Sequence, residues 1–301
     1  MKLVYQFPMR ALKHWDAWIG GHDLADIAVA AEAAGFDMVS TTDHPFPSND
    51  WIENGGHHAF DPFVALSFMA AATSRIRLLT FILVGGYRSP YLTAKATGTL
   101  DRLSRGRLVT GMGAGYQKGE FDVLGASFPD RGRRFDAAIR AIQSAWTGEV
   151  VDRDDEFFPA HGHIMLPRPI QQPGPPIWIG GNSKAAMRRV AELADGWLPF
   201  EQPAAMAEIT RTPALEADDL GGRILQLREM RMAAGRDAHI DVCFSPRLPN
   251  DQQAAVDALH AAIPAYERSG VTHLLIESKT RNFDDAAREI ELLGNVAAAY
   301  S

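Results

Sequence analysis

The chain has one cysteine, Cys243, among its 301 residues. A single thiol excludes an intramolecular disulfide framework, and it excludes zinc or iron–sulfur sites built from several cysteines. Cys243 lies inside an apolar run, so we predict that it is a core residue and not a nucleophile.

Long apolar runs, a secretion signal and an excess of positive charge are also lacking. No apolar segment reaches the length that spans a bilayer, and Met1 to Pro8 lacks the charged-then-apolar layout of a signal peptide. The formal net charge of −7 argues against nucleic acid as a main partner, because phosphate binding needs a basic face. A composition of 46% hydrophobic and 22% charged residues is that of a globular protein. We therefore expect a cytoplasmic protein without nucleic-acid or membrane partners.

Short β-branched runs alternate regularly with longer alanine-rich stretches. Eight such units predict an α/β fold of the (β/α)₈ TIM-barrel type, and the nearly continuous apolar strand runs are typical of buried parallel strands. The alternative, a doubly wound open sheet, is disfavoured because no G-x-G-x-x-G follows the first strand. The expected strands are 3–7, 37–41, 75–84, 107–111, 177–180, 196–199, 240–244 and 272–277, and the expected helices are 22–35, 61–73, 90–103, 131–146, 183–194, 223–234, 252–269 and 284–299.

The rhythm breaks once, between the fourth and fifth strands. Residues 149–176 are rich in proline and show no helical pattern. We interpret them as a surface insertion with a hairpin around Phe157 to Ile164, and the alternative is a domain linker. Because the βα rhythm then resumes, we predict one domain over 1–301. The stretch 201–222 stays ambiguous.

Polar and glycine-rich segments follow several strands, where the active site of a barrel lies. Asp43 and His44 follow the second strand, and such a pair suits acid–base work near neutral pH, although Asp43 as a turn cap and His44 as a surface residue is the plainer alternative. Glycines at 85–86 and 111–115 permit close approach to a ligand or only tight turns. Gly180, Gly181 and Asn182 precede a helix, a pattern that favours phosphate binding over an ordinary N-cap.

Other charged groups point to no separate site. The pairs His57-His58 and His161-x-His163 lack helical ligand spacing and a carboxylate partner, so we expect no metal. Arg131, Arg133 and Arg134 suit a solvated first helical turn better than an anion site.

Together these segments resemble the bacterial-luciferase-like flavin and deazaflavin oxidoreductases, and within them the coenzyme F420-dependent branch. The resemblance covers most of the chain to about Pro199. The matching segments are Thr42–Pro45, Tyr87–Pro90 with Ala94-Lys95, Thr99–Arg107, Gly111–Tyr116 with Glu120, Pro175–Gly181 and Ala194–Trp197.

The resemblance implies a set of site residues. Asp43 would contact the deazaflavin ring and His44 would give or take the proton. A non-proline cis peptide near Phe81-Ile82 would bulge against the ring, with Leu83 and Val84 beside it. Gly113, Ala114, Gly115 and Tyr116 would follow the cofactor tail, while Gly180, Gly181 and Asn182 would hold its phosphate. Trp51, His57 and Phe60 would shape the substrate pocket.

The function implied is hydride transfer between C5 of F420 and a small organic substrate, by a homodimer. Flavin members more often carry Glu-His where this chain has Asp43-His44, which favours F420. An FMN-dependent monooxygenase that uses oxygen is the first alternative, and a barrel that binds a flavin-type ligand without turnover is the second. Some F420 sugar-phosphate dehydrogenases have glutamate where Tyr116 stands, so their acid–base scheme and substrate are not carried over.

Overall fold

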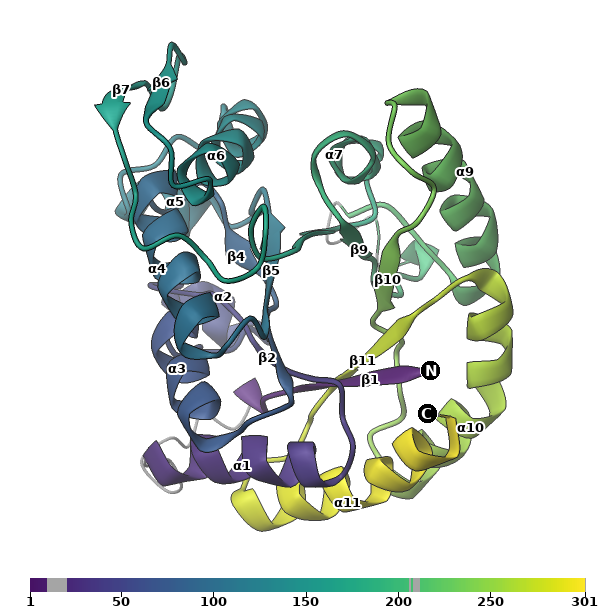
Figure 1. The fold of residues 1–301 in the computed structure, drawn as a ribbon. Coiled ribbons are helices and arrows are strands. Elements are labelled where there is room, and N and C mark those ends of the chain that lie inside the picture. Colours follow the sequence, from purple (N-terminus) through teal and green to yellow (C-terminus); the bar gives the residue numbers. More distant parts are fainter. Residues whose placement is uncertain (10–20, 206, 208–211, 301) are drawn as a thin grey trace.

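The computed structural model describes residues 1–9, 21–205, 207 and 212–300, in which eight parallel strands form a closed barrel (Figure 1). β1 pairs with both β2 and β11, and β3 pairs with β5, so the strands close into a ring. This confirms the predicted (β/α)₈ barrel over the open sheet. The barrel strands are β1 (Lys2–Gln6), β2 (Met38–Thr41), β3 (Arg77–Thr80), β5 (Leu108–Gly113), β8 (Ile177–Gly180), β9 (Gly196–Leu198), β10 (Asp241–Phe244) and β11 (His273–Glu277).

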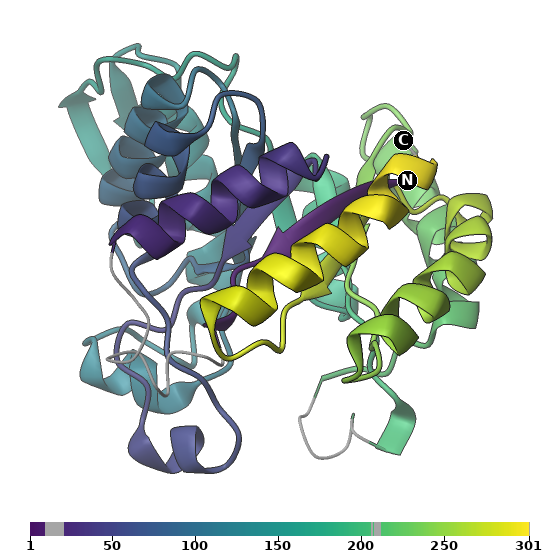
Figure 2. The ribbon, with the colours of Figure 1, turned by 90° about the horizontal axis from the view of Figure 1, so that it is seen from below.

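Helices cover the outside of the ring, as both views show (Figures 1 and 2). Asp61 accepts the N–H groups of Phe63 and Val64 and so caps α3, with Pro62 at the first helical position as predicted. No helix among the described residues is long and apolar enough to cross a membrane. The principal helices are α1 (Gly21–Ala33), α3 (Pro62–Ala72), α4 (Pro90–Leu103), α6 (Arg131–Trp146), α7 (Lys184–Leu193), α9 (Leu220–Ala233), α10 (Gln252–Ser269) and α11 (Phe283–Tyr300).

Two short helices, α2 (Asn49–Glu53) and α5 (Lys118–Val123), were not predicted. Helices of five and six residues have too few positions to show a 3.6-residue period. The ambiguous stretch 201–222 falls partly outside the described residues, because 206 and 208–211 are not described.

The third strand is not continuous, and the prediction of one strand over 75–84 was wrong in this respect. β3 ends at Thr80, and β4 (Leu83–Val84) continues beside β5 after a cis peptide bond between Phe81 and Ile82. The cis bond implied by the family resemblance is thus confirmed. An unbroken apolar run does not reveal a peptide isomer, so the break was invisible to hydrophobic periodicity.

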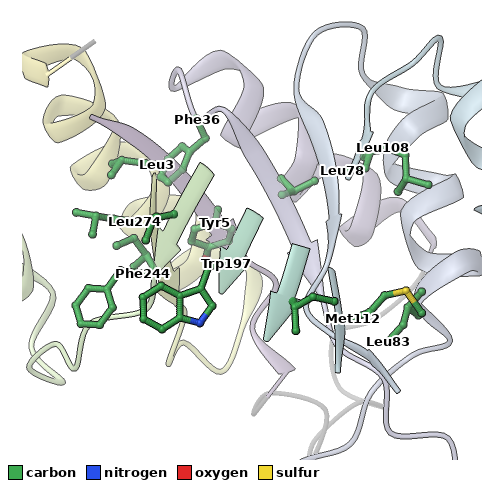
Figure 3. Packing of buried hydrophobic residues seen from close by; sticks show 14 of the residues in the cluster. Leu3, Tyr5, Phe36, Leu78, Leu83, Leu108, Met112, Trp197, Phe244 and Leu274 are labelled. Carbon is green, nitrogen blue, oxygen red and sulfur yellow. The ribbon is translucent and has the colours of Figure 1, made fainter. Parts of the chain in front are cut away.

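Two apolar layers hold the barrel together. Side chains such as Val4 and Leu79 fill its interior, where Cys243 is fully buried. Alternate residues point outward to the helices, and Figure 3 shows Leu3, Leu108 and Phe244 among them. The burial of Cys243 confirms that it is a core residue, and this burial raises the pKa of its thiol well above the ordinary value.

The 149–176 segment holds an antiparallel pair outside the barrel, β6 (Val151–Arg153) and β7 (Ala160–His163). The hairpin begins at Val151, before the predicted start near Phe157. Its turn is formed by Asp155, whose carboxylate accepts the N–H groups of Phe157 and Phe158. The segment returns over α4, where the Asp101 carboxylate accepts the N–H groups of Ile170 and Gln171 at 2.8 and 3.0 Å.

Arg107 closes the opposite end of the barrel from the strand C-termini. Its guanidinium donates to the backbone carbonyls of Ala70, Thr73, Ile76 and Ser104. Asp101 and Arg107 both belong to the Thr99–Arg107 segment, and the contacts of these two residues support the fold.

Gly111 is required by close backbone packing, and its substitution by alanine is expected to destabilise the barrel. A Cβ there would lie 2.1 Å from the carbonyl oxygen of Thr80 on the neighbouring strand. We expect Gly111→Ala to lower the free energy of unfolding by about 2–3 kcal/mol, measured by urea denaturation. Gly222→Ala is the control, because a Cβ on that glycine in α9 meets nothing within 4 Å. Equal stabilities for the two variants would contradict the argument.

Candidate active site

The site lies where β2, β4 and β5 end at the mouth of the barrel. Asp43 and His44 follow β2, Tyr87 and Arg88 follow β4, and Glu120 lies on α5 after β5. Because the C-terminal ends of parallel strands meet at one rim, residues distant in sequence come together there.

Asp43 is buried, and both of its oxygens are hydrogen-bonded. Arg88 binds it bidentately at 2.6 and 2.8 Å, and the Val84 N–H donates to the same carboxylate at 3.1 Å. Arg88 also lies 3.5 Å from Asp61. A planar guanidinium matches an ionised carboxylate, so Asp43 carries a charge that fastens β4 and its loop to β2.

His44 lies among aromatic rings, with its side chain only 8% exposed. Its ring centroid is 4.6 Å from that of Trp51, 5.0 Å from that of His57 and 6.4 Å from that of Tyr116. Its Nδ1 lies 3.0 Å from Glu120 Oε2, and Gln117 Nε2 lies 3.3 Å from the same nitrogen. The structure therefore brings together His44 with the two pocket residues Trp51 and His57.

Glu120 is fully buried beneath this cluster. Besides facing His44, it accepts the Tyr87 hydroxyl at 2.9 Å and the Phe46 N–H at 3.2 Å. Burial acts to raise the pKa of Glu120, but the hydrogen bond and charge of His44, with the other two donors, lower it overall. Burial, followed by the charge of Glu120, raises the pKa of Tyr87 well above its ordinary value, so Tyr87 stays a neutral donor.

Sequence reasoning did not assign Tyr87, Arg88 or Glu120 to the site. All three stand within segments matched to the family, so the resemblance held a signal that was not used. Nothing in their local sequence shows that Arg88 contacts Asp43, that Glu120 contacts His44, or that Tyr87 joins them through Glu120.

The residues expected beside the deazaflavin ring, 81 to 84, are buried to different extents. Phe81 and Ile82 are partly buried against the barrel interior, whereas Leu83 is buried in the outer layer, near Met112 in Figure 3. The δ-methyl group of Ile82 lies over both Gly113 and Gly180, 2.3 and 2.8 Å from the position of an added Cβ. These two glycines therefore make room for Ile82, in addition to any role toward a ligand.

The Gly181 position is open. Its φ is +110°, and an added Cβ would meet only Ala186 Cβ at 3.8 Å. Asn182 is occupied elsewhere, because its side-chain amide donates to the Phe200 carbonyl at 2.8 Å and accepts the Phe200 N–H at 3.2 Å. Ser183 caps α7 by accepting the Ala186 N–H. What remains open to a phosphate is thus the surface of Gly181, whose own N–H donates to the Leu198 carbonyl at 3.2 Å, and the N–H groups of α7 before Ala186.

The edge of the site holds four more residues that the sequence analysis considered: Ala114, Tyr116, Phe60 and Arg131. Tyr116 and Ala114 follow β5, and Tyr116 is exposed. Phe60 contacts Phe7 at 6.2 Å between ring centroids, so it extends an apolar wall from β1. Arg131 stacks on Phe128 at 4.0 Å and donates to the Gly115 carbonyl at 3.2 Å, a contact that supports the loop after β5.

The lowered pKa of Glu120 predicts a loss of stability in acid. A carboxylate whose folded pKa lies below the ordinary 4.5 stabilises the fold above that pH, and this contribution is lost as the pH falls through the folded pKa. We expect the difference in free energy of unfolding between wild type and Glu120→Gln to be largest near pH 7 and to shrink below pH 4.5. Urea denaturation across that range measures it, with Asp122→Asn on the exposed side of α5 as the charge-matched control. A difference independent of pH would contradict the assignment.

Comparisons with known proteins agree with this architecture. The family model described as luciferase-like monooxygenase matches residues 15–294. The F420-dependent glucose-6-phosphate dehydrogenase of Nakamurella multipartita is 34% identical over 228 residues, which cover 72% of this chain and 65% of that protein.

Two solved structures share the fold. A monooxygenase from Streptomyces bottropensis superposes with a TM-score of 0.81 at 21% identity, over 100% of both chains. An F420-dependent secondary alcohol dehydrogenase, solved with an F420–acetone adduct, superposes with a TM-score of 0.76 at 18% identity, over 100% of this chain and 99% of the other. At these identities the likeness establishes the barrel fold.

Proposed function

Because the chain belongs to the luciferase-like monooxygenase family, we propose that it is an oxidoreductase that uses coenzyme F420 to transfer hydride to or from a small organic substrate. The observation that carries the proposal is the position of His44, a titratable ring at the end of β2 that faces Glu120 and is walled by Trp51 and His57. The F420-dependent relative, at 34% identity, supports the choice of cofactor.

The residues present fit a phosphate-bearing planar cofactor. The open Gly181 position and the first turn of α7 suit the phosphate, while the Phe81–Val84 bulge suits the ring and Gly113 to Tyr116 the tail. Gly180 and Asn182 would act through their backbones, since Ile82 covers the one and Phe200 engages the side chain of the other. When bound, F420 would supply the hydride at C5.

The chain itself would handle the proton and exclude water. His44 would donate a proton to a carbonyl oxygen during reduction, or accept it from an alcohol in the reverse direction. Asp43, held by Arg88, would keep the end of β2 and β4 together beside the ring. Trp51, His57 and Phe60 would shape the pocket for the substrate's organic part.

Titration of the purified protein with F420 and with FMN tests the cofactor. We expect micromolar binding of F420, and oxidation of reduced F420 in the presence of a member of a panel of aldehydes, ketones and enones. Binding of FMN without F420 would overturn the proposal in favour of a flavin monooxygenase, an activity that the description of the matched family favours. Binding of F420 with no turnover across the panel in either direction would favour a non-catalytic barrel.

We also propose that the chain forms a homodimer. The outer faces of α3 and α4 are apolar yet exposed, with Phe68 at 51%, Leu92 at 69% and Leu103 at 73%. The two helices pack side by side, and exposed apolar side chains on neighbouring helices are of the kind that mark an association surface. Light scattering during gel filtration is expected to give a dimer mass for wild type and a monomer mass for Phe68→Glu. A monomeric wild type would refute the proposal.

A further inference from the structure

We infer that Glu120 is a positioning residue that fixes His44 as the Nδ1–H tautomer and leaves Nε2 as the nitrogen that exchanges the proton. The inference deepens the proposed function and rests on it for its kinetic part alone. It starts from the 3.0 Å contact between His44 Nδ1 and Glu120 Oε2.

The protonation state of Glu120 decides which nitrogen of His44 carries hydrogen. An ionised carboxylate can only accept hydrogen bonds, so a proton must lie on Nδ1 if the contact is a hydrogen bond. Glu120 has the surroundings of an ionised group, because the Tyr87 hydroxyl and the Phe46 N–H both donate to it in addition to His44. The fully buried side chain would be costly to ionise without these donors.

Tyr87 is the second side chain that holds the Glu120 carboxylate. Its hydroxyl donates to the same oxygen, Glu120 Oε2, that faces His44. Its ring also packs at 4.8 Å against Phe121, which follows Glu120 on α5, so the tyrosine and the helix hold each other in place. Because Tyr87 stays neutral, it orients the carboxylate without taking the proton.

The consequence concerns Nε2. Gln117 Nε2 also lies near Nδ1, at 3.3 Å, but the carboxylate of Glu120 is closer, at 3.0 Å, and accepts the hydrogen bond from Nδ1–H. With Nδ1–H bound to Glu120 in both the neutral and the charged ring, only Nε2 changes its protonation state. Among the residues that the structure describes, both hydrogen-bond partners of the His44 ring, Glu120 and Gln117, lie at Nδ1 and none lies at Nε2. The rings of Trp51, His57 and Tyr116 pack against the imidazole. The Glu120 carboxylate thus fixes the orientation of the His44 ring and determines that Nε2 is the atom that exchanges the proton. The acidic member of a catalytic triad acts on its histidine in the same way.

Long-range proton–nitrogen NMR of the cofactor-free protein tests the tautomer directly. In wild type at pH 8 we expect His44 to show a protonated Nδ1 and an unprotonated Nε2. In Glu120→Gln, whose amide can donate as well as accept, this single tautomer is expected to give way to a mixture or to Nε2–H. Asp122→Asn on the same helix is expected to leave it unchanged.

The kinetic readout separates positioning from folding. With reduced F420 and an accepted carbonyl substrate, Glu120→Gln is expected to lower kcat about 10–100-fold with little change in KM. A wild-type His44 that carries its proton on Nε2 would overturn the inference, and this result does not depend on whether any variant folds. An unchanged tautomer or an unchanged kcat in a folded Glu120→Gln protein would also overturn it. Failure to bind F420 would refute the proposed function while leaving the NMR result to decide the inference.

Discussion

Replacing His44 with alanine is expected to lower kcat/KM with reduced F420 and a carbonyl substrate by about 10²–10⁴-fold, the usual contribution of a positioned general acid or base. The ring is a titratable group that packs against both Trp51 and His57 at the barrel mouth. Its removal takes away the proposed proton donor, whereas the proposed phosphate site around Gly181 is untouched. F420 affinity is therefore expected to change far less than the rate, and stopped-flow oxidation with a parallel binding titration measures both.

His58→Ala is the matched control for this prediction. The His58 side chain is exposed. Its backbone carbonyl oxygen contacts the ring of His57, and this contact is kept in the alanine variant because the substitution changes only the side chain. We expect the control to keep wild-type kinetics. Turnover by His44→Ala at the wild-type rate would show that the proton is handled by another group.

Replacing Arg88 with methionine is expected to have the largest effect on stability. It would leave the Asp43 carboxylate, 1% exposed, without its bidentate partner, and breaking a buried ion pair in this way costs about 3–5 kcal/mol. We expect about 3 kcal/mol, the low end of that range, because the Arg88 side chain is 22% exposed and water would reach part of the site. Urea denaturation at pH 7 measures the loss.

Two further variants isolate the cause. Arg133→Met removes an exposed ion pair with Glu156 and is expected to cost below about 1 kcal/mol. The double variant Asp43→Asn with Arg88→Met removes the charge together with its partner and should recover part of the stability lost in Arg88→Met. If the double variant is no more stable than Arg88→Met alone, the loss arises from packing around Phe63, over which the guanidinium lies, and not from the unpaired carboxylate.

The repeating pattern was sufficient to predict the barrel and its principal elements. The bounds predicted for 90–103, 131–146, 177–180 and 252–269 agree with α4, α6, β8 and α10. Each of these has a clear start or stop in its own residues, such as Pro90 at the first turn of α4. Local signals of this kind need no knowledge of the rest of the chain.

The site was predicted only in part. Asp43 and His44 were found because they follow a strand and a barrel presents strand ends at one rim. Their partners were not found, because Arg88 is 45 positions from Asp43 and Glu120 is 76 positions from His44. The roles of Asp43, His44 and the pocket residues remain proposals that the experiments above test.

The amino-acid sequence by itself determined the order of strands and helices, the apolar interior and the rim on which polar residues gather. These features depend on periodicity and on turn-forming residues, which act over a few positions. Only the tertiary structure decided that the single cysteine lies in the barrel interior and not in the outer apolar layer, that Asp43 is bound by Arg88 and that His44 faces a buried carboxylate. Such contacts join strands that are distant in the chain, so their geometry exists only once the ring of strands has closed.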